Sequence, residues 1–456
     1  MLVFVTNQYI FQCIPYLILF PKYICPLLDP YCTPQDHCRS PEHYPVDISN
    51  PLSLNNWVEQ LNLACENPYK IALLGSMYFA GAIASGLFVT RLGDTHGRKL
   101  PTLISAIVSI PIHLGLMLSR NLNLSIALFF FLGLTRPGKM QVAFVYVSEM
   151  VPERYRRRVG SFILFFDGGS LIMFALYFKY ISKSWLYFQI WALLMSIVST
   201  LVLFKIPESP KFLIKKGRFD DARVSLLKIA GYNNVYNSQK DIIQNHLFEG
   251  EITTSKGSSC ESIMTQVGGG TLSEFVKDRA QLVKLVIFVF MWMAQSFSYY
   301  LAFFMTRKME GDFFLNTFVY SGTELFSHLF VGLIINKLSV NAAYLIAFLT
   351  ACFSSMMYCL LRVSNPEYVP FFLGLLIFGI IFSTNTNWNS NQFLFPVIYA
   401  SSTNGLCNIF ARGINIVSPQ IAELDQPTPM IVIGVTCFVA ALMSLMLKPM
   451  ERKQSM

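Results

Sequence analysis

Charged residues are scarce in this chain of 456 residues. Asp, Glu, Lys and Arg together make up 13% of it, whereas hydrophobic residues make up 54%. The mean hydropathy is +0.48. A soluble protein of this size could not hide the 40 Phe and the other apolar side chains in a single core. The composition therefore excludes a soluble fold and predicts a chain that crosses a membrane several times.

The patterns that mark catalysis are also missing. The sequence has no recognisable nucleotide-binding loop, catalytic triad or cluster of metal ligands. We therefore expect no enzyme activity, no cofactor and no resident metal. The net charge of +9 does not predict a nucleic-acid partner, because the basic clusters lie in short loops beside apolar runs, where they would face anionic lipid.

Cysteine is sparse outside the apolar runs. The four that lie together there are Cys25, Cys32, Cys38 and Cys65. Their spacing is unlike that of a zinc site and their loop, 21–68, should be extracytoplasmic, so we expect two disulfides. Three pairings are open at this point. The loop lacks an Asn-x-Ser/Thr sequon, and N-glycosylation is not predicted there.

Twelve apolar runs are long enough to cross a bilayer core of about 30 Å. They cover residues 1–20, 70–90, 100–118, 123–147, 159–178, 185–205, 283–305, 313–335, 342–361, 369–388, 403–422 and 428–447. The first run lacks the basic start and the small-residue cleavage site of a signal peptide, so we favour a membrane helix over that alternative.

The two halves of the chain resemble each other. Residues 86–92 align with 332–338, and 149–156 align with 393–400, at nearly the same displacement. Such a repeat indicates two similar bundles related by an axis along the membrane normal. The expected domains are a bundle over 1–206, a cytoplasmic linker with a short amphipathic helix over 207–281, a second bundle over 282–448 and a tail over 449–456.

A short basic turn separates the second and third runs. Gly97 gives the turn backbone freedom, and Asp94 is placed to pair with Arg98. Lys and Arg resist translocation, so the turn should be cytoplasmic. Both termini are then cytoplasmic as well, in a plasma membrane or an endomembrane.

This turn resembles the signature of the major facilitator superfamily between its second and third helices. Residues 149–156 and 207–213 resemble signatures that sugar porters and organic-ion transporters carry after their fourth and sixth helices. Residues 56–65 and 75–81, together with the Cys-containing loop, resemble the organic cation/anion transporter branch. The resemblance implies an all-α membrane protein with twelve transmembrane helices in two pseudo-symmetric six-helix bundles, and transport by alternating access.

The resemblance also implies a charged clasp at the cytoplasmic face. Its members in this sequence are Asp94, Gly97, Arg98, Glu149, Arg156 and Glu208. In the second half Phe393 and Ala400 replace the Glu and the Arg, and Tyr344 stands where Arg98 stands in the first half. A clasp is therefore expected in the first half alone.

Ionisable and polar residues inside the apolar runs are the candidates for a substrate cavity, because a charge at the membrane centre needs a partner or water. The candidates are Arg136, Lys139, Asp167, Gln295, Tyr299, Glu324, His328 and Arg412. Glu324 and His328 are one helical turn apart, which should favour a protonated His328. Ion pairing that only steadies the bundle, for example between Asp167 and Lys139, is the alternative.

The predicted function is transport of a small organic ion. Arg412 tilts the expectation slightly towards anions, since the matching position tends to be basic in anion carriers of the resembling branch. Protons are a candidate coupling ion, and the carrier is expected to work as a monomer in the lipid bilayer. A sugar porter and a transport-deficient membrane receptor or sensor are the alternatives.

Overall fold

The computed structural model describes residues 6, 9–26, 32–236, 240, 278–395 and 397–447. The side chains of two predicted site residues, Arg156 and Asp167, lie outside the described part, as does most of the predicted linker between 237 and 277.

Long helices cover the apolar runs in both halves of the chain. In the first half they are α5 (Pro68–His96), α6 (Lys99–Leu118), α7 (Leu122–Pro137), α8 (Ala143–Met150), α9 (Glu153–Leu176) and α10 (Trp185–Lys205). In the second half they are α17 (Arg279–Met305), α18 (Phe313–Ile334), α19 (Val340–Leu361), α20 (Val369–Leu394), α21 (Val397–Ile414) and α23 (Thr428–Ser444). Of the helices in the described ranges, six are long and apolar enough to cross a membrane by length and composition.

Two of these helices contain or end in a π-helical turn. A π-helix, η2 (Gly138–Val142), joins α7 to α8, and another, η3 (Tyr177–Ile181), ends α9. The first predicted run is represented by helical residues that include α2 (Ile14–Leu17). Such π-turns are frequent at functional sites in helices.

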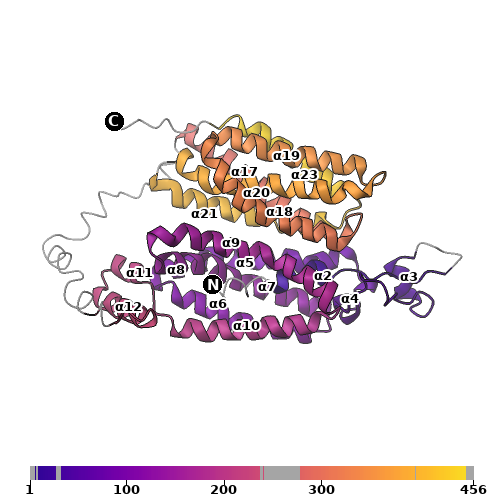
Figure 1. Cartoon of the computed structure of the whole chain (residues 1–456), viewed down its shortest axis with the longest axis horizontal. Helices are drawn as coiled ribbons and strands as arrows, with labels where there is room; N and C mark the ends of the chain where they lie inside the picture. Colours follow the sequence, from indigo (N-terminus) through magenta and orange to yellow (C-terminus); the bar gives the residue numbers. More distant parts are fainter. Residues whose placement is uncertain are drawn as a thin grey trace.

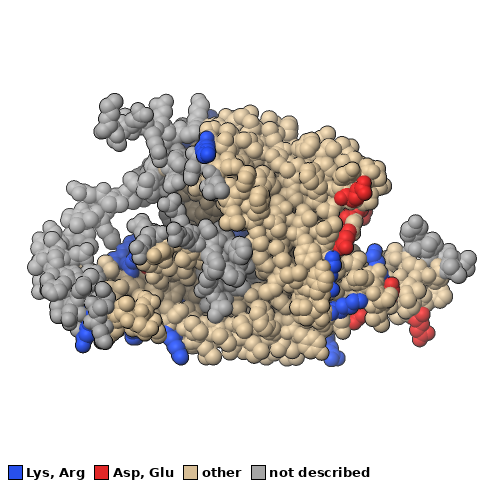
Figure 2. All heavy atoms as spheres, viewed as in Figure 1, with Lys and Arg blue, Asp and Glu red and all other residues tan. Residues whose placement is uncertain are grey.

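The helices form two bundles, one from each half of the chain, lying side by side in Figure 1. Helix α5 packs on α7 and α6 on α10 in the first bundle, while α19 packs on α20 and α23 in the second. The bundles meet where α9 packs on α18, and where α5 packs on α21 and α22 (Ser418–Ile421). On the face drawn in Figure 2 the charged side chains gather towards the two ends, and the middle of the surface lacks them among the described residues. This is the pattern of a membrane-spanning protein.

Two glycines allow α5 and α7 to approach closely. A Cβ atom on Gly81 would lie 2.1 Å from the carbonyl oxygen of Phe130, and one on Gly133 would lie 2.1 Å from that of Tyr78. Any larger residue at either position would push the helices apart. The close contact fixes the position of Arg136, one turn further along α7.

The four loop cysteines form two disulfides, as predicted, and the structure settles their pairing. Cys25 bonds to Cys32, and Cys38 bonds to Cys65. Asn56 joins the loop to the end of α2, because its amide nitrogen donates to the carbonyl oxygens of Tyr16, in α2, at 2.7 Å and of Leu19, just after it, at 2.8 Å. We call the end of the molecule that carries this loop the disulfide-loop side.

The opposite end carries α11 (Pro210–Lys215) and α12 (Phe219–Tyr232), and we call it the linker side. Helix α12 covers the predicted amphipathic segment. Its inner face buries Ala222, Ser225 and Ala230. Asp220 and Asp221 in its first turn, where the helix dipole favours acids, pair with arginines of the same segment.

Candidate functional site

Two arginines from opposite bundles come together where the bundles meet. Arg136 of α7 is 6% exposed, and its Nη2 donates to the hydroxyl of Tyr300 in α17 at 2.9 Å. Its guanidinium also lies over the ring of Tyr78, 5.7 Å from the ring centre. Arg412 of α21 lies within electrostatic range of Arg136 and of the hydroxyl groups of Tyr300 and Tyr78. The predicted cavity residues Arg136 and Arg412 are therefore neighbours.

Arg412 has a neutral hydrogen-bond partner in the first bundle. With its amide oxygen turned to Arg412, Gln141 of η2 accepts hydrogen bonds from Nη2 at 2.5 Å and from Nε at 3.3 Å. The Nη1 atom of Arg412 is buried without a hydrogen-bond partner among the described residues. An unsatisfied buried donor costs free energy, so this atom of Arg412 is a candidate contact for a bound solute.

Glu324 of α18 lies at a second contact between the bundles. It is 6% exposed, and its Oε1 accepts a hydrogen bond from the hydroxyl of Tyr299 at 3.0 Å. A Cβ atom on Gly168 of α9 would lie 3.2 Å from the Glu324 carboxyl carbon, so the carboxylate is pressed against the other bundle. Gln295 is buried on α17, one turn before Tyr299.

His328 does not pair with Glu324 as the sequence suggested. Its Nδ1 lies 3.5 Å from the amide nitrogen of Asn385 on α20. Glu324 and His328 are one helical turn apart on α18, but the polar contact of His328 is with neutral Asn385 on α20. The expected pair of a carboxylate with a protonated histidine is not present in the described structure.

Lys139 is also placed differently from the prediction. It is 2% exposed, and its Nζ donates to the hydroxyl of Ser109 in α6 at 3.0 Å. His113 of α6 forms a hydrogen bond from its Nε2 to Oε1 of Gln189 in α10 at 2.9 Å. Its imidazole lies within electrostatic range of the Lys139 ammonium. The π-turn η2 directs Gln141 towards the second bundle, whereas Lys139 belongs to the interior of the first.

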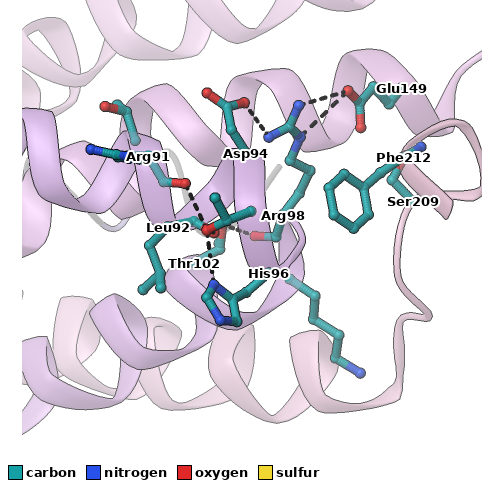
Figure 3. Close-up of polar contacts among 12 residues, drawn as sticks. Arg91, Leu92, Asp94, His96, Arg98, Thr102, Glu149, Ser209 and Phe212 are labelled. Atoms are coloured by element: carbon teal, nitrogen blue, oxygen red, sulfur yellow. Dashed lines mark hydrogen bonds and ion pairs between the residues drawn. The ribbon is translucent and has the colours of Figure 1, made fainter. Parts of the chain in front are cut away.

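Three members of the predicted clasp, Arg98, Asp94 and Glu149, contact one another at the linker side, within the first bundle. The Nη1 atom of Arg98 donates to Asp94 at 2.6 Å, and its Nε lies 3.4 Å from Glu149 at the end of α8. Figure 3 shows the guanidinium between these two carboxylates. The ring of Phe212 in α11 lies 5.3 Å from the same guanidinium, a contact that the sequence analysis did not include. Asp94 and Glu149 thus hold Arg98 at one end of the first bundle.

Glu208 serves a different role from that of an ion-pair partner. Its carboxylate accepts hydrogen bonds from three backbone N–H groups: those of Arg98 at 2.9 Å, Lys99 at 3.1 Å and Ser209 at 2.9 Å. It therefore caps the start of α6, where the helix dipole favours an anion. Gly97 has φ +110° and a Cβ there would lie 2.2 Å from Glu208 Oε2, so the turn requires glycine.

Sequence reasoning missed Gln141 and assigned Tyr78 and Tyr300 no specific contact. A polar Gln141 in an apolar run, little more than one helical turn after Arg136, was the available signal. The sequence alone does not show that a π-turn separates the two and rotates the second towards Arg412.

Comparison with known proteins agrees with this architecture. The sequence matches the model of the Major Facilitator Superfamily over residues 60–419. The chain belongs to this superfamily. The recognised resemblance is therefore confirmed, and with it the fold of two helical bundles.

The superfamily member has curated relatives named for organic cations. It is 25% identical over 410 residues to an organic cation transporter-like protein of Drosophila melanogaster, covering 88% of this chain and 71% of that one. It is 22% identical over 417 residues to the organic cation/carnitine transporter 2 of Homo sapiens, covering 88% and 70%. Among solved structures, the inward-open xylose transporter XylE from E. coli aligns with a TM-score of 0.64 at 13% identity, covering 99% and 96% of the two chains. The protein is an integral multi-pass membrane transporter of the Major Facilitator Superfamily.

Proposed function

We propose that this transporter binds a small organic ion between Arg136 and Arg412 and carries it across the membrane by rocking the two bundles. The observation that carries the proposal is that the two neighbouring guanidiniums belong to opposite bundles: Arg136 to the first and Arg412 to the second. A solute held by both is released when the bundles separate on one side, which is the requirement of alternating access.

The contacts on the disulfide-loop side fit a reversible closure. The hydroxyl of Ser76 in α5 donates to the carbonyl oxygen of Ile416 at 2.7 Å, and Gln420 of α22 donates to the carbonyl oxygen of Tyr69 at 3.2 Å. Phe304 and Pro419 of the second bundle pack against Gly75 of the first. A few neutral hydrogen bonds and a small apolar contact can be exchanged at modest cost when the bundles rock. We propose that in this state the solute exchanges with the linker side, and that the linker side, with both termini, is cytoplasmic.

We further propose that the solute carries an anionic group, such as a carboxylate. The curated relatives are named for organic cations and for carnitine. The positive charges of Arg136 and Arg412 instead favour a negative group, and we propose that Glu324, which accepts a hydrogen bond from Tyr299, contacts a cationic or hydroxyl group elsewhere on the same solute. Glu324, at the contact between the bundles, is also our candidate for proton coupling.

Uptake into vesicles containing the purified full-length chain tests the proposal. The panel includes organic anions, organic cations, solutes with both charges and hexoses, each measured at two pH values. Replacing Arg412 by Gln should reduce uptake of the best anionic solute at least about tenfold, because loss of one buried charge contact costs about 2–5 kcal/mol. The matched control is Arg120→Gln, which removes one exposed arginine from the loop before α7. Unchanged uptake of the same anions by Arg412→Gln would rule out the assigned role.

A transport-deficient receptor remains the second candidate, because the second bundle lacks the charged residues of the clasp. Tyr344, at the position equivalent to Arg98, is buried in a neutral hydrogen bond to Asn387. Solute binding without uptake, measured on the same vesicles, would favour this candidate. Preference for hexoses over all ions would instead favour the sugar porter.

A further inference from the structure

Three lysines from three different helices gather at the linker-side end of α10. Lys205 is the last residue of α10, Lys99 begins α6, and Lys228 lies on α12. The Nζ atom of Lys99 donates to the carbonyl oxygen of Phe204 at 2.9 Å, so this ammonium is held at the end of α10.

Helix α12 is tied to the same place. The hydroxyl of Tyr232 donates to the carbonyl oxygen of Lys205 at 3.0 Å. Lys228 lies one turn earlier on the same face of α12. Its ammonium is close enough to that of Lys99 for the two charges to repel each other. The fold therefore holds positive charges together at this point against their repulsion.

The nearby carboxylates are engaged elsewhere. Glu208 attracts Lys99, but its oxygens accept the backbone hydrogen bonds that cap α6. Asp220 and Asp221 pair with Arg223 and Arg218. In the described parts of the chain, Lys99, Lys205 and Lys228 form no ion pair with a carboxylate. With Glu208 counted, the three lysines still carry a net positive charge.

The cluster stands at the edge of an apolar, outward-facing surface. On α10, Leu201 and Phe204 are 59% and 52% exposed, and on the adjacent α6, Leu100 and Ile104 are 44% and 45% exposed. In a membrane protein, such side chains face acyl chains. A lipid whose chains lie along α6 and α10 would have its headgroup at the three lysines.

We propose that Lys99, Lys205 and Lys228 form a binding site for the phosphate-bearing headgroup of an anionic phospholipid in the leaflet at the linker side. The ammonium groups supply hydrogen-bond donors and charge to the phosphate, and the exposed faces of α6 and α10 receive the chains. The headgroup would join α12 and the ends of α6 and α10, and so hold the linker helices against the first bundle. The site lies outside the solute site proposed above and does not depend on it.

Native mass spectrometry of the full-length protein released from nanodiscs tests the site. Nanodiscs of phosphatidylcholine alone are compared with nanodiscs that also contain phosphatidylinositol 4,5-bisphosphate or phosphatidylserine. We expect retained anionic lipid on the unmodified protein. The triple variant K99Q/K205Q/K228Q should retain it at least about tenfold less, since each lysine near an anionic headgroup contributes about fivefold to affinity.

The matched control is K211Q/K215Q/K216Q, which removes the same charge from three exposed lysines of α11 and its end. We expect it to change retention less than about twofold. Equal losses in the two triple variants would overturn the site, because they would indicate attraction by overall charge only. Retention unchanged in both would overturn it as well.

Lys228→Gln alone is the second variant, because the Lys228 side chain makes no hydrogen bond in the described parts of the chain whose loss could destabilise the fold. It should lower retention about fivefold and leave the melting temperature in phosphatidylcholine unchanged. Inorganic phosphate at millimolar concentration should not displace the lipid, because it lacks the chains. Displacement by inorganic phosphate would assign the lysines to a free anion and contradict the lipid site.

Discussion

The two bundles fix their linker-side turns by different physical means. In the first bundle, the turn between α5 and α6 is held by charge: Glu208 caps α6, and Arg98 lies between Asp94 and Glu149. In the second bundle, the residue that aligns with Arg98 in sequence is Tyr344, in the second turn of α19. Its hydroxyl donates to Asn387 of α20 at 2.8 Å, and Tyr344 is fully buried.

Neutral groups also fix the neighbouring helix ends of the second bundle. The hydroxyl of Ser339 accepts from the backbone N–H of Ala342 at the start of α19, and Asn341 donates to the carbonyl oxygen of Leu447 at 2.8 Å. In this repeated fold, charges therefore stabilise the turn between α5 and α6, whereas neutral hydrogen bonds stabilise its counterpart, which we call the neutral turn and which includes the start of α19 as far as Tyr344. The first should respond to salt, and the second should not.

The largest effect is expected at Gly97. Gly97→Ala places a Cβ 2.2 Å from the Glu208 carboxylate in a backbone conformation with φ +110°. Strain and loss of the α6 cap should together cost about 2–4 kcal/mol of unfolding free energy. The measurement is thermal unfolding in detergent. The control is Gly217→Ala, where φ is +71° and a Cβ would meet nothing within 4 Å. Equal losses would show that the contact with Glu208 contributes nothing.

Glu208→Gln should have the next effect. The amide keeps one oxygen acceptor but loses the negative charge at the start of α6, so we expect a loss of about 1–2 kcal/mol. Glu66→Gln, which removes a half-exposed carboxylate near the start of α5, is the matched control. A loss at Glu208 no larger than at Glu66 would contradict the capping role.

Tyr344→Phe tests the neutral turn. Asn387 Oδ1 loses its buried donor, and we expect a loss of about 1–2 kcal/mol that is the same at low and high salt. The measurement is unfolding by denaturant at two concentrations of sodium chloride. A strong dependence on salt would remove the distinction between the two turns.

Asp94→Asn should have the smallest effect. Asp94 is 70% exposed, and exposed pairs contribute about 0–1 kcal/mol, a contribution that salt screens. We expect a difference from the unmodified protein at low salt that disappears at high salt. A loss larger than that of Tyr344→Phe would reverse the ranking of the two turns.

The sequence predicted the helices and the disulfides well because both follow from patterns along the chain. Apolar runs of membrane length identify the helices, and four cysteines in one external loop identify the two bonds, though not their pairing. The sequence predicted that Arg136 and Arg412 line the same cavity, but not that they are neighbours, because their distance depends on how the bundles face each other.

The misplaced residues follow from geometry that no local pattern shows. Lys139 lies within η2, and its ammonium donates to Ser109 of α6 inside the first bundle. His328 contacts Asn385 on the neighbouring helix α20 and does not pair with Glu324 on its own helix α18. Glu208 binds backbone N–H groups because the turn at Gly97 brings three of them to its carboxylate.

The central claim is that one solute contacts Arg136 and Arg412 at the same time. The most direct test is the binding affinity of the best anionic solute for the single variants Arg136→Gln and Arg412→Gln and for the double variant. If both guanidiniums act on one anion, each single variant should lose affinity about tenfold or more. The loss in the double variant should then be much smaller than the product of the two single losses. Full affinity in either single variant, or strictly multiplicative losses, would contradict a solute shared by the two bundles.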